Sequence, residues 1–138
     1  MEINEDQWCK ERRQDVLKYL ASQGIEHGQV SESPAWDEIP YTSIWAIESK
    51  KSPDWVGWWA ICGDHPTDYI SSKNFKEPRT AYEAIAKNWL EICQCADEGK
   101  EHPSMKITLG NKKLIQMLRS RANMFLEWVA DDNNWQYD

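Results

Sequence analysis

The apolar positions of the chain follow helical spacing in three segments. From Trp8 to Leu20 they recur every three or four residues and form one stripe. Asn4 and Gln7 precede this stripe in a capping-box pattern, and Gly24 is a natural stop after it. The same criteria predict three helices along the chain: residues 5–23, 81–97 and 111–130.

The predicted second helix has the clearest start and stop signals. Thr80 and Glu83 form a capping box in TAYE, directly after the helix-favouring Pro78. Gly99 is positioned to end the helix. These signals predict that the helix begins at residue 81, with Thr80 as its N-cap.

Two segments rich in strand-forming residues lie between the first two helices. TSIWAIESK covers residues 42–50 and WVGWWAIC covers residues 55–62. The turn that joins them is expected over Ser52 to Trp55, with Pro53 at the second position of a type I turn. The pattern predicts a β-hairpin. A third strand is expected near residues 68–71, and a further short one at residues 105–109.

The connection over residues 24–41 reads as irregular, because glycine, serine and proline punctuate it. A connection this long in a small chain is unusual, so a short helix or strand is also expected within it. The order of elements predicts an α+β fold with two layers, a small antiparallel sheet packed with three helices. The length fits a single domain over residues 1–138.

The strand over residues 55–62 is apolar on both faces, which is unusual for an antiparallel sheet. In one interpretation its tryptophans are core residues, covered on both sides. In the other, some of them form an exposed aromatic patch beside acidic residues, and such patches mark interaction sites. The candidate partner-binding surface consists of Trp45, Trp55, Trp58, Trp59, Asp64 and Asp68.

The formal net charge is −7, and it is concentrated in one region. Residues 31–72 carry seven acidic residues and only Lys50 and Lys51 as basic ones. Nucleic acid and anionic membranes need a basic footprint, so both are disfavoured as partners. The acidity is compatible with a basic protein partner, although it also serves solubility alone.

The segment MEINEDQW at the start is acidic and polar, unlike a signal peptide. No apolar run approaches the length of a membrane span. We therefore expect a cytoplasmic protein whose four cysteines are reduced, with no structural disulfide.

The stretch CGDHPTDY contains the candidate catalytic residues His65, Asp64 and Asp68, close to Cys62. A histidine beside carboxylates has the chemistry of a general base, and a small hydrolase or transferase is the alternative function. No known catalytic motif matches, however, and aspartate and proline are ordinary turn residues. We favour the turn interpretation and a protein that is not an enzyme.

Cys93, Cys95 and His102 are a weak candidate for a zinc site. Zinc sites usually show two cysteines separated by two to four residues, and here only one residue separates them. Residues two apart on a helix also point in different directions. A small core residue is the favoured interpretation of Cys93, and we expect neither a metal nor another cofactor.

The block SIWAIESKKSPDWVGWWAICGDHPTDYI, followed by PRTAYEAIAKNWLEICQ, resembles a family of short, uncharacterised proteobacterial proteins with a domain of unknown function. The likeness covers about residues 42–95, and its most distinctive strings are GWWAI and PTDY. The resemblance implies a stand-alone, cytoplasmic, single-domain bacterial protein. It implies no activity, cofactor or catalytic residue.

These observations favour a non-enzymatic protein-binding module that uses the acidic, tryptophan-rich surface. Small acidic proteins of this type serve as adaptors, inhibitors or immunity proteins, and the comparison is an analogy of class. A homodimer remains the alternative arrangement, because an apolar two-faced strand is also suited to burial between two copies.

Overall fold

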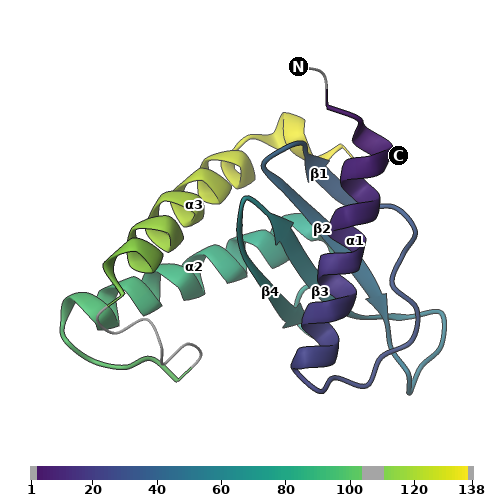
Figure 1. The fold of residues 1–138 in the computed structure, drawn as a ribbon, viewed down its shortest axis with the longest axis horizontal. Coiled ribbons are helices and arrows are strands. Elements are labelled where there is room, and N and C mark those ends of the chain that lie inside the picture. The colour runs from purple at the N-terminus through teal and green to yellow at the C-terminus, as the bar shows by residue number, and fades with distance from the viewer. Residues whose placement is uncertain (1–2, 104–110, 137–138) are drawn as a thin grey trace. The chain divides into compact units, whose positions relative to one another are not determined.

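The computed structural model describes residues 3–103 and 111–136 (Figure 1). The chain forms two compact units, Met1–Ala81 and Tyr82–Asp138. Its helices and antiparallel sheet confirm the predicted α+β class, whereas the single domain stays a prediction. In chain order the elements are α1 (Glu5–Ser22), β1 (Trp36–Glu38), β2 (Thr42–Glu48), β3 (Val56–Gly63), β4 (His65–Ser71), α2 (Pro78–Asp97), α3 (Lys112–Ala130) and the 3-10 helix η2 (Asp132–Trp135).

Helix α1 begins and ends at the predicted signals. The side-chain oxygen of Asn4 accepts the backbone N–H of Gln7 at 3.0 Å, which satisfies one of the free amides of the first turn. At the other end Gly24 has a φ of 66°, and the N–H of Ile25 then reaches back to the carbonyl of Leu20. Glycine adopts this left-handed conformation without a Cβ clash, so Gly24 fixes the end of α1.

The four strands form one antiparallel sheet in the order β1-β2-β3-β4. The predicted hairpin is confirmed as β2 and β3, in which Trp45 pairs with Ala60. The expected third strand is β4, which pairs with β3 and begins earlier than expected, at His65. The connection over residues 24–41 contains β1, and Val30 in it forms a β-bridge with Ile47. This segment is therefore more regular than its sequence indicates.

The turn of the β2–β3 hairpin differs from the predicted type I. The N–H of Trp55 donates to the carbonyl of Ser52 at 3.1 Å, which closes the expected four-residue turn. Asp54, at the third position, has a φ of 73°. A positive φ at this position is the mark of a type II turn, and aspartate tolerates it better than most residues. The N–H of Asp54 also donates to the Glu48 carboxylate, which holds the turn in this form.

Helix α1 lies across β2, β3 and β4 and covers one face of the sheet (Figure 1). Alternate residues of the strands point toward it, as a period of two requires. Burying these side chains against α1 stabilises the first unit. The buried cluster between α1 and the sheet consists of Val16, Leu20, Val30, Trp45, Ile47, Ala60 and Cys62.

Helix α2 begins at Pro78, three residues before the predicted start. Proline suits the first position of a helix, because its fixed φ is already helical and its missing N–H is not needed there. Thr80 therefore lies inside the first turn, where its hydroxyl donates to the carbonyl of Glu77 at 3.0 Å. The prediction that Thr80 caps the helix is wrong, whereas the predicted stop at Gly99, with a φ of 72°, is confirmed.

The second unit has an aromatic core between α2 and α3, which run side by side (Figure 1). The ring of Phe125 lies 5.0 Å from that of Tyr82 and 5.7 Å from that of Trp89. Trp135 of η2 packs against Tyr82, and its indole N–H donates to the carbonyl of Trp128 at 2.9 Å. Trp135 therefore anchors the polar tail that follows α3, since only 7% of it is exposed.

The short strand expected at residues 105–109 falls on a segment that lies outside the described residues. Within residues 3–103 and 111–136, every helix is too short or too polar to cross a membrane.

Candidate functional site

Two of the four tryptophans assigned to the candidate surface are core residues. Trp45 is fully buried, and its indole N–H donates to the hydroxyl of Ser43 at 2.9 Å. Trp59 is 5% exposed and donates to the backbone carbonyl of Phe75 at 2.8 Å. A buried indole with a satisfied N–H is typical of a structural residue. The assignment of Trp45 and Trp59 to an exposed surface is therefore corrected.

Trp55 has the opposite environment. It follows the turn of the β2–β3 hairpin, and 73% of it is exposed. The adjacent Val56, the first residue of β3, is 39% exposed. The two side chains form an apolar patch on a hairpin whose backbone is held by the sheet.

A shallow groove of about 260 Å³ lies beside this patch. Its walls come from the hairpin and from the chain segment that bridges to β2 through Val30. The lining includes Trp55, Val56, Asp54, Glu48, Glu32 and Ala46. An aromatic side chain and three carboxylates thus border one groove.

The three carboxylates have different roles. Glu48 accepts the N–H of Asp54 at 3.0 Å and the N–H of Gln29 at 3.2 Å, one on each oxygen. These hydrogen bonds to the charged form hold the pKa of Glu48 below its usual range. Glu48 therefore ties the turn to the bridging segment. The side chains of Asp54 and Glu32 have no partner within the described part of the chain, so both charges are available to a ligand.

The predicted acidic residues Asp64 and Asp68 lie at the other end of β3. Asp64 is exposed in the turn between β3 and β4, and Asp68 is half-buried in β4, where it accepts the N–H of Tyr69 at 2.8 Å. The 8 residues of β3 separate Asp64 from Trp55, a span of roughly 30 Å at the usual rise of a strand. The structure therefore does not bring Asp64 to the exposed tryptophan.

The sequence interpretation missed Glu32, Glu48 and Asp54 as neighbours of Trp55. Asp54 precedes Trp55 directly, so it could have been recognised as an adjacent charge. Glu32 reaches the groove only because Val30 pairs with Ile47, and no local pattern indicates that pairing.

His65 is 8% exposed, and both of its ring nitrogens have partners. Nδ1 lies 2.8 Å from the backbone carbonyl of Pro66, and Nε2 lies 2.8 Å from the hydroxyl of Thr42. A carbonyl only accepts, so Nδ1 carries a proton and donates to Pro66. These contacts are those of a histidine that joins β2 to β4.

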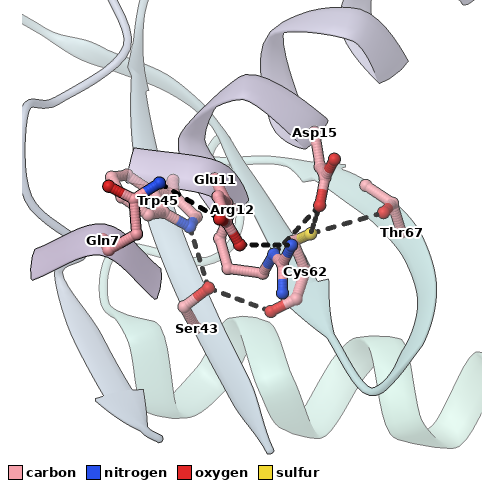
Figure 2. Close-up of polar contacts among 8 residues, drawn as sticks. All are labelled: Gln7, Glu11, Arg12, Asp15, Ser43, Trp45, Cys62 and Thr67. Carbon is pink, nitrogen blue, oxygen red and sulfur yellow. Dashed lines mark hydrogen bonds and ion pairs between the residues drawn. The ribbon is translucent and has the colours of Figure 1, made fainter. Parts of the chain in front are cut away.

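Cys62 belongs to a polar cluster between α1 and the sheet (Figure 2). Its thiol donates to Asp15 at 3.7 Å and accepts from Thr67 at 3.6 Å. Burial raises the pKa of the thiol, so Cys62 is a protonated structural residue and not an activated nucleophile. Arg12 binds the same Asp15 oxygen at 2.9 Å and lies over the ring of Trp8, which joins these groups to α1.

The candidate zinc residues are not arranged as a metal site. Cys93 is buried and donates to the carbonyl of Ile115 at 3.5 Å. His102 lies 3.8 Å from the Glu91 carboxylate. Among residues 3–103 and 111–136, no three histidine, cysteine, aspartate or glutamate side chains are placed to hold a metal ion.

Comparison with known proteins identifies a family but no function. No curated protein and no solved structure matches the chain. One family model, described as a domain of unknown function (DUF4826), matches residues 2–135. That match includes both compact units. The chain therefore belongs to the DUF4826 family.

Proposed function

We propose that this protein is a non-enzymatic protein-binding module of the bacterial cytoplasm. Its binding surface is the hairpin surface, which we define as Trp55, Val56, Asp54, Glu32 and the groove beside them. The observation that carries the proposal is the 73% exposure of Trp55 on a well-held hairpin. The surface replaces the one expected from sequence, of which it keeps Trp55 alone and omits Trp45, Trp58, Trp59, Asp64 and Asp68.

An exposed tryptophan has the properties of a binding anchor. Tryptophan is the residue most enriched at binding hot spots, because it supplies a large, rigid contact area with few rotatable bonds. Trp55 needs no rearrangement to serve in this way, since the Glu48 contacts already fix the turn on which it sits. A preorganised anchor loses less conformational entropy on binding.

The charges beside Trp55 favour a basic partner. Asp54 and Glu32 are exposed carboxylates, and the chain as a whole has a net charge of −7. A lysine or arginine of the partner would lie over the indole face and pair with these carboxylates. Such complementarity also speeds association with a basic protein. An adaptor, an inhibitor or an immunity protein for a basic toxin has this chemistry.

A hydrolase or transferase centred on His65 has less support. Nε2 of His65 already has a hydrogen-bond partner in the buried hydroxyl of Thr42, and Asp64 lies in an exposed turn. A general base must reach the proton that it abstracts. We therefore propose the binding function and not the catalytic one.

The test is capture of partners by tagged protein from a lysate of the native bacterium, comparing the wild type with Trp55→Ala. Tyr41→Ala is the matched control, because Tyr41 is an exposed aromatic residue outside the groove, 49% exposed. We expect one stoichiometric partner that Trp55→Ala loses and Tyr41→Ala retains, and whose binding weakens as salt is raised.

Retention of the partner by Trp55→Ala would contradict the assigned surface. Binding that is insensitive to salt, or an acidic partner, would contradict the assigned chemistry. Light scattering of the purified protein measures its oligomeric state and tests whether the surface binds a second copy of the chain. A dimer that Trp55→Ala converts to a monomer would show that the surface binds a second copy instead.

A further inference from the structure

The β2–β3 hairpin borders a second hollow, of about 280 Å³, which plays no part in the proposed function. It is lined by Trp58, Gly57, Ser49, Ser71, Lys50, Lys51 and Glu26, and we call it the Trp58 hollow. Its volume is just below the usual range of sites for small molecules, so it suits only a small ligand.

One wall of the hollow is the side chain of Trp58. This residue is half-buried and packs against the hydrophobic cluster under α1, so its position is fixed. Its indole N–H has no acceptor among residues 3–103 and 111–136. Trp45 and Trp59 both donate to protein acceptors, so Trp58 differs from the buried tryptophans beside it.

The two serine hydroxyls of the hollow also have hydrogens to donate. Ser49 accepts the N–H of Ser52, and Ser71 accepts the N–H of Lys73, each at 3.2 Å. Accepting a hydrogen bond uses a lone pair and leaves the O–H free. In the described part of the chain, neither O–H has an acceptor.

Lys50 and Lys51 add two ammonium groups. Neither forms an ion pair with any described carboxylate, although the chain has a large excess of acidic residues. The lining therefore combines one flat aromatic wall with an indole N–H, two hydroxyls and two ammonium groups as donors. Glu26 supplies the one carboxylate in the lining of the hollow.

From this excess of donors we infer that the Trp58 hollow binds a small organic anion with a flat apolar part, of the class of aromatic carboxylates. The flat part lies against the ring of Trp58, where apolar contact favours it. The carboxylate accepts from the lysines and the serine hydroxyls, and hydrogen bonds to a charged acceptor are the stronger kind. No covalent step is involved.

Glu26 limits the charge that the hollow accepts. Its carboxylate repels a second negative charge on the ligand, so a monoanion fits better than a dianion. Replacing it by Glu26→Gln removes this repulsion without changing the size of the side chain. Anion binding should then become tighter, which is the opposite of the effect of a lysine substitution.

Benzoate is the probe that we would use, followed by the ¹⁵N-indole resonance of Trp58, which Trp58→Phe assigns. We expect that resonance to shift in a saturable way. The double variant Lys50→Gln, Lys51→Gln should weaken binding by roughly three- to tenfold, as expected for the loss of two exposed charge pairs. Lys112→Gln, Lys113→Gln is the matched control, because it makes the same charge change on α3, and it should leave binding unaltered.

Several results would overturn the inference. One is a Trp58 resonance that does not respond to benzoate, or that responds equally to benzyl alcohol, which lacks the charge. Another is equal binding of acetate, which lacks the flat part. Weakening by Glu26→Gln, or an equal loss in the Lys112, Lys113 control, would show that the assigned electrostatics are wrong. None of these results depends on Trp55, so this test and the test of the proposed function fail separately.

Discussion

The Nε2 atom of His65 and the hydroxyl oxygen of Thr42 lie 2.8 Å apart, and both residues are buried. They are the first residues of β4 and β2, so the hydrogen bond joins two strands that are not neighbours in the sheet. Thr42→Val keeps the shape of the side chain but removes this hydrogen bond. We expect the free energy of unfolding to fall by about 1–3 kcal/mol, the usual cost of removing one partner of a buried hydrogen bond.

Urea denaturation measures this effect through the midpoint and slope of the transition. Thr67→Val is a suitable comparison, because Thr67 donates only to the weak acceptor Sγ of Cys62 and is half-buried. An equal loss in the two variants would mean that the contact with His65 contributes nothing particular.

Replacing the tryptophans of the hairpin by alanine should lower the free energy of unfolding by different amounts. Trp45 is fully buried, whereas Trp55 is 73% exposed. Trp45→Ala should lower the free energy of unfolding by about 3–5 kcal/mol, while Trp55→Ala should change it by less than about 0.5 kcal/mol. Similar losses in both variants, measured in the same urea series, would place Trp55 in the core and remove the basis of the proposed function.

Acid stability should depend on Glu48. Its two backbone N–H partners lower its pKa in the folded state, so the charged form is the one that folding favours. This contribution is present above the unfolded pKa of about 4.3 and is lost as the pH falls through the lower folded value. Between about pH 5 and 3, the stability of Glu48→Gln should therefore decline less steeply than that of the wild type.

The measurement is the urea midpoint over that range of pH. Glu38→Gln is the control, because Glu38 is an exposed residue of β1 outside the groove. Parallel declines in wild type and Glu48→Gln would contradict the assigned role of the two N–H bonds.

Alkaline stability should depend on Tyr19. Burial, together with the nearby charge of Asp68, raises the pKa of Tyr19 well above its usual value. Its contribution is complete below the unfolded pKa of about 10 and is lost as the pH rises through the folded value. Tyr19→Phe keeps the edge contact with the ring of Tyr69 and removes the titration. The variant should lose stability less steeply above about pH 10, and an unchanged slope would refute the assignment.

The cysteines should react with an alkylating reagent at different rates, which depend on how deeply each is buried. Burial raises the pKa of both Cys62 and Cys93, and each thiol donates to a protein acceptor. We expect iodoacetamide to modify the half-buried Cys95 first and to reach Cys62 and Cys93 only after the protein unfolds. Peptide mapping by mass spectrometry follows each site. Early labelling of Cys62 would indicate that the polar cluster under α1 opens readily.

Much of the fold follows from local patterns. Asn4 and Gly24 bound α1 as their backbone chemistry requires, and the run of strand-forming residues on each side of Pro53 predicts the hairpin. The errors arise where two local signals compete. Pro78 starts α2 in place of Thr80, and the turn at Asp54 is type II because the Glu48 carboxylate holds its N–H.

The proposed binding surface was harder to predict, because exposure depends on contacts between distant segments. Alternation places Trp58 and Trp59 on opposite faces of β3, but it does not tell which face is covered. The bridge between Val30 and Ile47 brings Glu32 to the groove, and its partners are 17 positions apart in the printed sequence. Only the pairing of strands shows that Trp55 remains outside the core.

The tryptophans also serve as natural spectroscopic probes of unfolding. Trp45 and Trp59 belong to the unit Met1–Ala81, whereas Trp89, Trp128 and Trp135 belong to the unit Tyr82–Asp138. Each unit thus carries its own indole probes, and their resonances can be followed separately during denaturation. Coincident loss of both sets would mean that the chain folds in one cooperative step, and separate losses would show that each aromatic core is sufficient for its own unit.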